Sequence, residues 1–112
     1  MNNRMHDLKI RREYFQAILT GNKKSEFRKC DARDFKFHDL IRLNEITFIQ
    51  PSDKSYFLGD RASYTGRQMI VRITDVTAVN SVYEELPVSP TFVMLSFEVI
   101  SAIDEARGLV LI

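Results

Sequence analysis

Alternating apolar and polar residues predict most of the elements in this chain. Residues 6–10 alternate so that Leu8 and Ile10 point to one side, which is typical of a half-buried strand. The next stretch, 11–20, instead places apolar side chains at helical spacing, and these are Tyr14, Phe15, Ile18 and Leu19. Gly21 follows directly, and glycine commonly ends a helix because it tolerates the left-handed backbone conformation. This part of the chain therefore predicts a strand followed by an amphipathic helix.

A second alternating stretch is centred on Phe27 and predicts a strand that ends near Asp31. Successive side chains of a strand point to opposite faces, so Glu26 and Arg28 share the face that Phe27 does not occupy. Because Phe27 is the bulky apolar residue of this stretch, we expect it in the core. The face of Glu26 and Arg28 is then expected to look outward or into a cleft.

The rest of the pattern adds strands separated by irregular segments. Apolar alternation and apolar runs predict strands at 40–48, 69–79, 91–100 and 109–112. Glycine, proline and clustered polar residues predict irregular segments at 31–38, 50–67 and 82–90. Together these elements predict an α+β, mostly β fold, namely a small barrel with one prominent N-terminal helix. Its most apolar strand, 91–100, is expected to be central. The core residues expected from the later strands are Leu43, Val71, Ile73, Val93 and Leu95.

Length and composition are those of one globular domain. The chain has 112 residues, of which 45% are apolar and 28% charged. Cys30 is the only cysteine, which excludes an internal disulfide and favours a reducing compartment. No apolar run approaches the ~20 residues of a membrane-spanning helix, and the N-terminus has no apolar signal core. We therefore expect a cytoplasmic domain without membrane association.

The net charge of +1 conceals an uneven distribution. Residues 1–42 contain 11 of the 16 Lys and Arg and 6 of the 15 Asp and Glu, a balance of +5, whereas residues 43–112 contain 5 and 9, a balance of −4. A basic half on a nearly neutral protein favours a localised anionic partner. The alternative is a solvated face whose charges pair locally.

The residues after the predicted helix resemble a known family motif. Gly-x-Lys-x-x-Glu-x-Arg, at Gly21, Lys23, Glu26 and Arg28, is similar to the motif of the ASCH domains, relatives of the PUA-like RNA-binding barrels. The resemblance extends from residue 6 to about residue 100, and its other matching positions are 6–9, 29–35, Asp39 and 64–67. These positions resemble a small ASCH-related subgroup of uncharacterised function that is common in phages and mobile elements.

The resemblance implies a single PUA-like domain over residues 1–112, with 101–112 as a C-terminal extension outside it. Some relatives in the wider ASCH group hydrolyse the acyl amide of a modified cytidine with the motif lysine, a threonine two positions before the motif arginine, and a later glutamate. Here the lysine is Lys23, but the threonine position holds Glu26, and this chain lacks the helical insert that carries the later glutamate. Other relatives are ribonucleases that use the lysine-rich motif.

The charged residues around the motif suggest a ligand cleft. In this interpretation Arg28 offers a planar fork to a phosphate or carbonyl, Lys23 is a point cation, and Glu26 accepts from a base edge or acts as a general base. The simpler interpretation is a surface ion-pair cluster of little energetic value. The expected ligand-binding residues are His6, Lys9, Lys23, Lys24, Glu26, Arg28, Lys29, Arg33, Tyr64 and Arg67.

Two further patterns bear on the ligand. His-Asp-Leu occurs at 6–8 and 38–40, but this spacing is no known metal pattern and Asp39 suits a turn before a strand, so we expect no metal site and no cofactor. The predicted long loop interleaves aromatic residues with arginine, as unstacked bases require, at Tyr56, Phe57, Arg61, Tyr64 and Arg67. The alternative is that the side chains of Phe57 and Tyr64 cover the end of the barrel.

These observations support three hypotheses about function. The first, which we favour, is binding of RNA or a modified nucleotide in a basic cleft around Lys23, Glu26, Arg28 and Lys29. The second is hydrolysis of a nucleic acid or nucleoside, with Lys23 and Glu26 as the catalytic pair. The third is a phage-type accessory protein that binds a host protein through its acidic half and the apolar residues 109–112. Salt separates the first from the third, because phosphate contacts weaken steeply with ionic strength.

Overall fold

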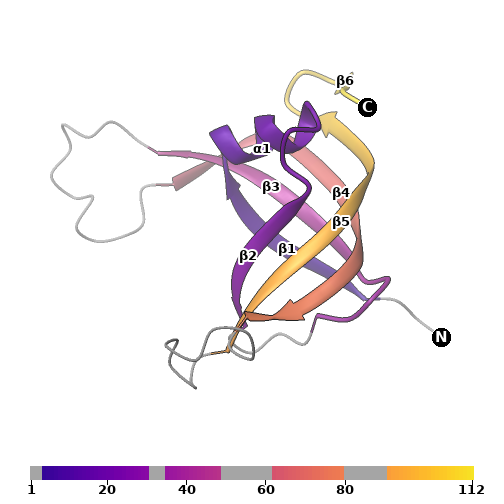
Figure 1. The fold of residues 1–112 in the computed structure, drawn as a ribbon. Helices are drawn as coiled ribbons and strands as arrows, with labels where there is room; N and C mark the ends of the chain where they lie inside the picture. Colours follow the sequence, from indigo (N-terminus) through magenta and orange to yellow (C-terminus); the bar gives the residue numbers. More distant parts are fainter. Residues whose placement is uncertain (1–3, 31–34, 49–61, 80–90) are drawn as a thin grey trace, which may run out of the picture.

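The structure, a computed structural model, describes residues 4–30, 35–48, 62–79 and 91–112. In these ranges six strands form one sheet, and one helix lies over an end of it (Figure 1). The strands are β1 (Met5–Arg11), β2 (Ser25–Cys30), β3 (Leu40–Phe48), β4 (Ala62–Ala78), β5 (Thr91–Asp104) and β6 (Leu109–Val110), and the helix is α1 (Arg12–Leu19). This arrangement confirms the expected mostly β architecture with one N-terminal helix.

The sheet has the order β1-β3-β4-β5-β2, with β6 beside β5, and it curls into a half-barrel (Figure 1). β1 and β3 are parallel, and the other neighbours are antiparallel. Register shifts occur once between β3 and β4 and twice between β4 and β5, and such bulges bend long strands. β1 and β2 are the two edges of the main sheet. We call the gap between these two edges the seam.

The apolar core lies inside the curl and beneath α1. Leu8 and Ile10 are buried on β1, as predicted, and Phe15 and Ile18 are buried on α1. Tyr14 was expected in the same apolar stripe, but its side chain is 46% exposed. The predicted core residues of the later strands are also buried, and these are Leu43, Val71, Ile73, Val93 and Leu95.

The end of α1 sets the direction of the motif that follows it. Gly21 has the expected positive φ of 84°. Its N–H donates to the carbonyl of Ile18 at 3.0 Å, and the N–H of Asn22 donates to the carbonyl of Ala17 at 2.9 Å. These two bonds form the Schellman motif, which satisfies carbonyl groups left open at a helix end. The chain therefore turns back toward β2, which begins after a connection of five residues, 20–24.

The prediction that Phe27 lies in the core is wrong. Its side chain is 45% exposed and stacks on Phe92, with ring centroids 5.3 Å apart. In the β2–β5 register Glu26 lies opposite Leu95, a core residue, so Glu26 and Arg28 face the inside of the curl. The physical reason is that β2 is an edge strand beside the seam, where the inner face still reaches solvent.

The predicted loop at 50–67 is also wrong at its C-terminal end, because β4 already begins at Ala62. Tyr64 pairs with Ile46 on β3, and partner strands override the turn preference of Gly66. Residues 50–61, with Tyr56, Phe57 and Arg61, lie outside the described residues. β5 similarly continues past the predicted end at residue 100 to Asp104, which places Ala102 in the core.

Candidate functional site

A cavity of about 300 Å³ lies at the seam, between β1, β2, the start of α1 and β3. This volume is at the lower end of the range for small-molecule sites. Its lining combines three cations and one carboxylate with aromatic and apolar side chains, and the residues are Lys9, Ile10, Arg11, Tyr14, Glu26, Phe27, Arg28 and Ile46. We call this space the seam cavity. It brings together three of the expected ligand-binding residues, Lys9, Glu26 and Arg28, although β1 and β2 are not paired with each other.

Glu26 is the one acidic residue in the lining of the seam cavity. Its side chain is 13% exposed, and its carboxylate oxygens lie 3.6 Å from Lys23 Nζ and 3.6 Å from Arg28 Nη2. These separations are ion-pair distances but exceed the length of a direct hydrogen bond. Within the described ranges, no protein group donates a hydrogen bond to this carboxylate. Toward the described part of the chain, Glu26 therefore keeps its capacity to accept hydrogen bonds.

Arg28 spans the seam. Its Nη2 donates a hydrogen bond of 2.7 Å to the backbone carbonyl of Lys9, which lies on the free edge of β1. The Nε of the same guanidinium is buried and has no hydrogen-bond partner in the part of the chain that the structure describes. A buried donor without a partner costs roughly 1–3 kcal/mol. One nitrogen of Arg28 thus links the two edges of the sheet across the seam, and another has no hydrogen-bond partner among the described residues.

Lys23 belongs to this site, whereas its neighbour does not. Lys23 Nζ lies 3.6 Å from Glu26 and 5.4 Å from the centroid of the Tyr14 ring. Lys24 lines a different cavity, together with Phe97 and Glu98, and Lys23 borders that cavity too. The contact with Glu26 is therefore what distinguishes Lys23 from Lys24.

The other expected ligand residues are distributed around the molecule. Lys9 lines the seam cavity, and Tyr64 lies beside it, since its ring centroid is 6.0 Å from Lys9 Nζ. His6 and Arg67 do not line this cavity, and each holds a buried carboxylate elsewhere. The Lys29 side chain and Arg33 lie outside the described residues.

Arg67 and Thr65 hold Glu45, a residue that sequence reasoning did not select. Glu45 is 2% exposed and accepts hydrogen bonds from Thr65 Oγ1 at 2.7 Å and from Arg67 Nε at 3.0 Å. Arg67 also donates a second bond to Glu45 through Nη2 and contacts Gln16 Oε1. Burial alone would raise the pKa of Glu45, but the bonds from Arg67 and Thr65 outweigh it and lower the pKa below its ordinary value.

A bulge creates the Glu45 cluster. Between the pairs Asn44–Gln68 and Ile46–Tyr64, one residue of β3 lies opposite three residues of β4. Gly66, in the middle of these three, has a φ of 96°, and a Cβ at this position would lie 2.7 Å from the Cβ of Ala106. The available signal was that Glu45 shares the strand parity of the core residues Ile41 and Leu43.

His6 and Asp39 form a second buried pair, at the start of β1. His6 Nε2 and Asp39 Oδ2 are 2.8 Å apart, and the His6 ring packs on Phe35. Burial would raise the pKa of Asp39, yet the bonds from His6 and from two backbone N–H groups lower it. The two His-Asp-Leu segments therefore meet through His6 and Asp39, whereas Asp7 pairs with Arg42 on the surface. In the described ranges no three His, Cys, Asp or Glu side chains form a metal-binding group.

The C-terminal residues carry exposed apolar side chains. Leu109, Val110 and Ile112 are 50%, 79% and 52% exposed, and Leu111 packs partly on the core. A protein partner at this tail stays a prediction. None of the helices in the described part of the chain has the length and apolar character needed to cross a membrane.

Comparison with known proteins places these features in a family. The model of a domain of unknown function, DUF3850, matches residues 5–97, which include β1, α1 and β2 of the seam. The chain belongs to the DUF3850 family. A curated relative of this DUF3850 domain is the uncharacterized 12.9 kDa protein in the GpA 3' region of Escherichia phage P2. It is 33% identical over 82 residues, which are 73% of this chain and 62% of the relative, so the match spans less than two thirds of that protein. Its phage origin agrees with the expected occurrence in phages.

Proposed function

We propose that this DUF3850 domain is a PUA-like domain of the ASCH type that binds RNA or a modified nucleotide in the seam cavity. The observation that carries the proposal is the pairing of two unsatisfied groups at one place. Among the residues that the structure describes, none donates a hydrogen bond to the largely buried Glu26 carboxylate, and none accepts one from the buried Nε of Arg28. Buried polar groups are normally paired, so a ligand that offers both a donor and an acceptor would complete the site.

A nucleobase edge has this chemistry. Cytosine and guanine carry an exocyclic amine and a carbonyl oxygen on one edge. Carboxylates accept hydrogen bonds from base amines, and arginine donates to base carbonyl oxygens. In this arrangement Glu26 accepts from the amine, Arg28 donates to the carbonyl, and the ring of Tyr14 borders the base. Lys9, Arg11 and Lys23 then supply positive charge for a phosphate.

Calorimetric titration with the four nucleoside monophosphates tests the proposal. We expect cytidine and guanosine monophosphates to bind more tightly than uridine and adenosine monophosphates, with affinities that fall as salt rises. Glu26→Gln should reduce the preference among bases, because the amide is uncharged and offers one accepting oxygen in place of two. Binding of no nucleotide, at low salt and with intact fold, would remove the proposal.

Adjacent lysines supply a matched control for charge. Lys23→Gln and Lys24→Gln remove one positive charge each from neighbouring positions, but only Lys23 contacts Glu26. We expect Lys23→Gln to weaken nucleotide binding and Lys24→Gln to leave it nearly unchanged. Equal weakening in both variants would indicate general electrostatic attraction in place of a defined site.

Hydrolysis is a second candidate, and the 3.6 Å separation of Lys23 Nζ and Glu26 favours it. A lysine beside a carboxylate at a nucleotide-sized cavity is suited to activate water for attack on an acyl or phosphoryl group. Incubation with N-acylated nucleosides and with RNA, for the wild type, Lys23→Ala and Glu26→Gln, tests this candidate. Product that is lost in both variants supports hydrolysis, and product that persists in both indicates a contaminant.

A further inference from the structure

The cations around the seam are paired with exposed aromatic rings. Energetically significant cation–aromatic contacts occur roughly once per 70–80 residues, so a chain of this length is expected to have one or two. The described residues contain four, and three of these lie around the seam cavity. The three pairs are Lys23 with Tyr14 at 5.4 Å, Lys9 with Tyr64 at 6.0 Å, and Arg11 with Phe48 at 5.1 Å, each measured to the ring centroid.

These rings are available at the surface. Tyr14, Phe48 and Tyr64 are 46%, 55% and 63% exposed, which means that about half or more of each side chain is not used in packing. The fourth pair places Arg67, which belongs to the Glu45 cluster and is 18% exposed, over the fully buried ring of Phe15. Exposed aromatic residues that adjoin one another mark interaction surfaces more often than isolated ones do.

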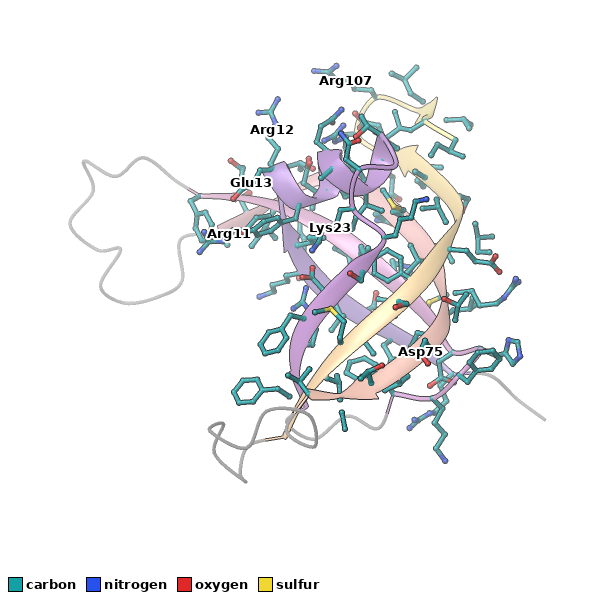
Figure 2. The ribbon with its side chains drawn as sticks, in the orientation of Figure 1. Arg11, Arg12, Glu13, Lys23, Asp75 and Arg107 are labelled. Carbon is teal, nitrogen blue, oxygen red and sulfur yellow. The ribbon has the colours of Figure 1, made fainter. Side chains whose placement is uncertain are left out.

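The three pairs follow one path across the seam. On one side of the seam, Tyr14 lies on α1 and Lys23 lies just before β2. On the other side, the cations of the remaining two pairs lie on β1, and their rings lie at the connected ends of β3 and β4. Ile46 joins them, because it lines the seam cavity, pairs in register with Arg11 on one side and lies opposite Tyr64 on the other. Figure 1 shows the ends of β3 and β4 projecting beyond the curled sheet, and Figure 2 shows Arg11 beside this projection and Lys23 below α1.

Alternation of aromatic faces with cations is how proteins hold single-stranded nucleic acids. Bases stack on the rings, and the phosphates that link them contact the cations. Four cations lie along this path, namely Lys9, Arg11, Lys23 and Arg28, against Glu26 in the seam cavity and Asp7 and Glu105 in the pocket that Tyr64 lines. An anionic chain with regularly spaced aromatic groups fits this surface better than a free nucleotide, which would use only the cavity.

We infer that the ligand is a single-stranded nucleic acid of about four nucleotides, which stacks successively on Tyr14, Tyr64 and Phe48 while one base enters the seam cavity. This inference rests on the proposed binding of a base in that cavity. It adds the length of the ligand and its course, from α1 across the seam to the projecting ends of β3 and β4. Base stacking and phosphate contacts are common to RNA and DNA, so the experiment uses both backbones.

A length series of labelled oligocytidines tests the inference. Fluorescence anisotropy would measure binding of the one-, two-, four- and eight-nucleotide chains, as RNA and as DNA, at one low salt concentration. We expect affinity to increase up to about four nucleotides and then to level off. Tyr64→Ala and Phe48→Ala should each weaken binding of the eight-nucleotide chain by roughly fivefold or more and leave cytidine monophosphate unaffected.

Phe37→Ala provides the matched control, because Phe37 is 56% exposed, like Phe48, and has no cation over its ring among the described contacts. It should leave binding of the eight-nucleotide chain unchanged. Equal affinity for one and eight nucleotides would overturn the inference while leaving the proposed function intact. Length-dependent binding that is unchanged in both Tyr64→Ala and Phe48→Ala would show that the ligand does not run over these two rings. Absence of binding at every length would instead refute the proposed function itself.

Discussion

Replacing Glu45 with glutamine removes one partner of a buried ion pair while keeping the shape of the side chain. Glutamine can still accept from Thr65, but the guanidinium of Arg67, whose side chain is 18% exposed, loses its counter-charge. Removing one partner of a buried pair costs roughly 3–5 kcal/mol. Arg67 retains its contacts with Gln16 and with the Phe15 ring, so we expect a value near the lower end, about 3 kcal/mol.

Urea unfolding at pH 7 measures this loss directly, and thermal unfolding should show a midpoint lowered by about 10 °C. Glu98→Gln is the matched control. Glu98 also pairs with an arginine, Arg72, at 2.8 Å, but the two side chains are 54% and 41% exposed, so its loss should cost at most about 1 kcal/mol. If Glu45→Gln costs no more than Glu98→Gln, burial does not determine the strength of these pairs and the reasoning is wrong.

Three further predictions concern stability. The free energy of unfolding should fall below about pH 4.5, the ordinary pKa of Glu45, because the pKa values of Glu45 and Asp39 are lower in the folded than in the unfolded chain. This stabilisation is present above the unfolded values and is lost as the pH falls through the folded ones, so Asp39→Asn should flatten a plot of urea midpoint against pH. Gly66→Ala should cost more than about 2 kcal/mol, because φ is positive there and the added Cβ would lie 2.7 Å from the Cβ of Ala106. Gly21→Ala should cost only about 1–2 kcal/mol, because φ is positive but nothing lies within 4 Å of the added Cβ. Similar melting temperatures for the two variants would contradict the crowding at Gly66. Phe27→Ser should lower the free energy of unfolding by less than about 1 kcal/mol, whereas Phe15→Ala should lower it by about 3–5 kcal/mol. A loss for Phe27→Ser as large as that for Phe15→Ala, measured by urea unfolding, would mean that Phe27 belongs to the core.

The local pattern was sufficient wherever a strand has a fully enclosed inner face. Leu8 and Ile10 on β1, and Leu43 on β3, were placed correctly because burial of apolar area fixes the parity of such strands. The helix end at Gly21 was also predictable, since it depends on backbone conformation within a few residues.

The same rule failed for β2 because its environment is set by distant parts of the chain. Alternation correctly separated Phe27 from Glu26 and Arg28, but it does not show which face is enclosed. The seam keeps the inner face of β2 polar, and Phe92, 65 positions later in the sequence, covers part of Phe27 on the outside. Glu45 was missed for a related reason, since its partners Thr65 and Arg67 come from another strand across a bulge.

The strand order has a consequence for how the chain folds during synthesis. β2, which carries Glu26 and Arg28, pairs with β5 and with no other described strand. The ribosome releases Ser25–Cys30 long before Thr91–Asp104, so the earlier strand waits without a partner while most of the chain is made. Pairings between such distant segments form slowly, because the intervening chain must first lose its conformational freedom. The seam cavity is therefore assembled last, and a nascent chain that stops before β5 has the motif but no seam cavity.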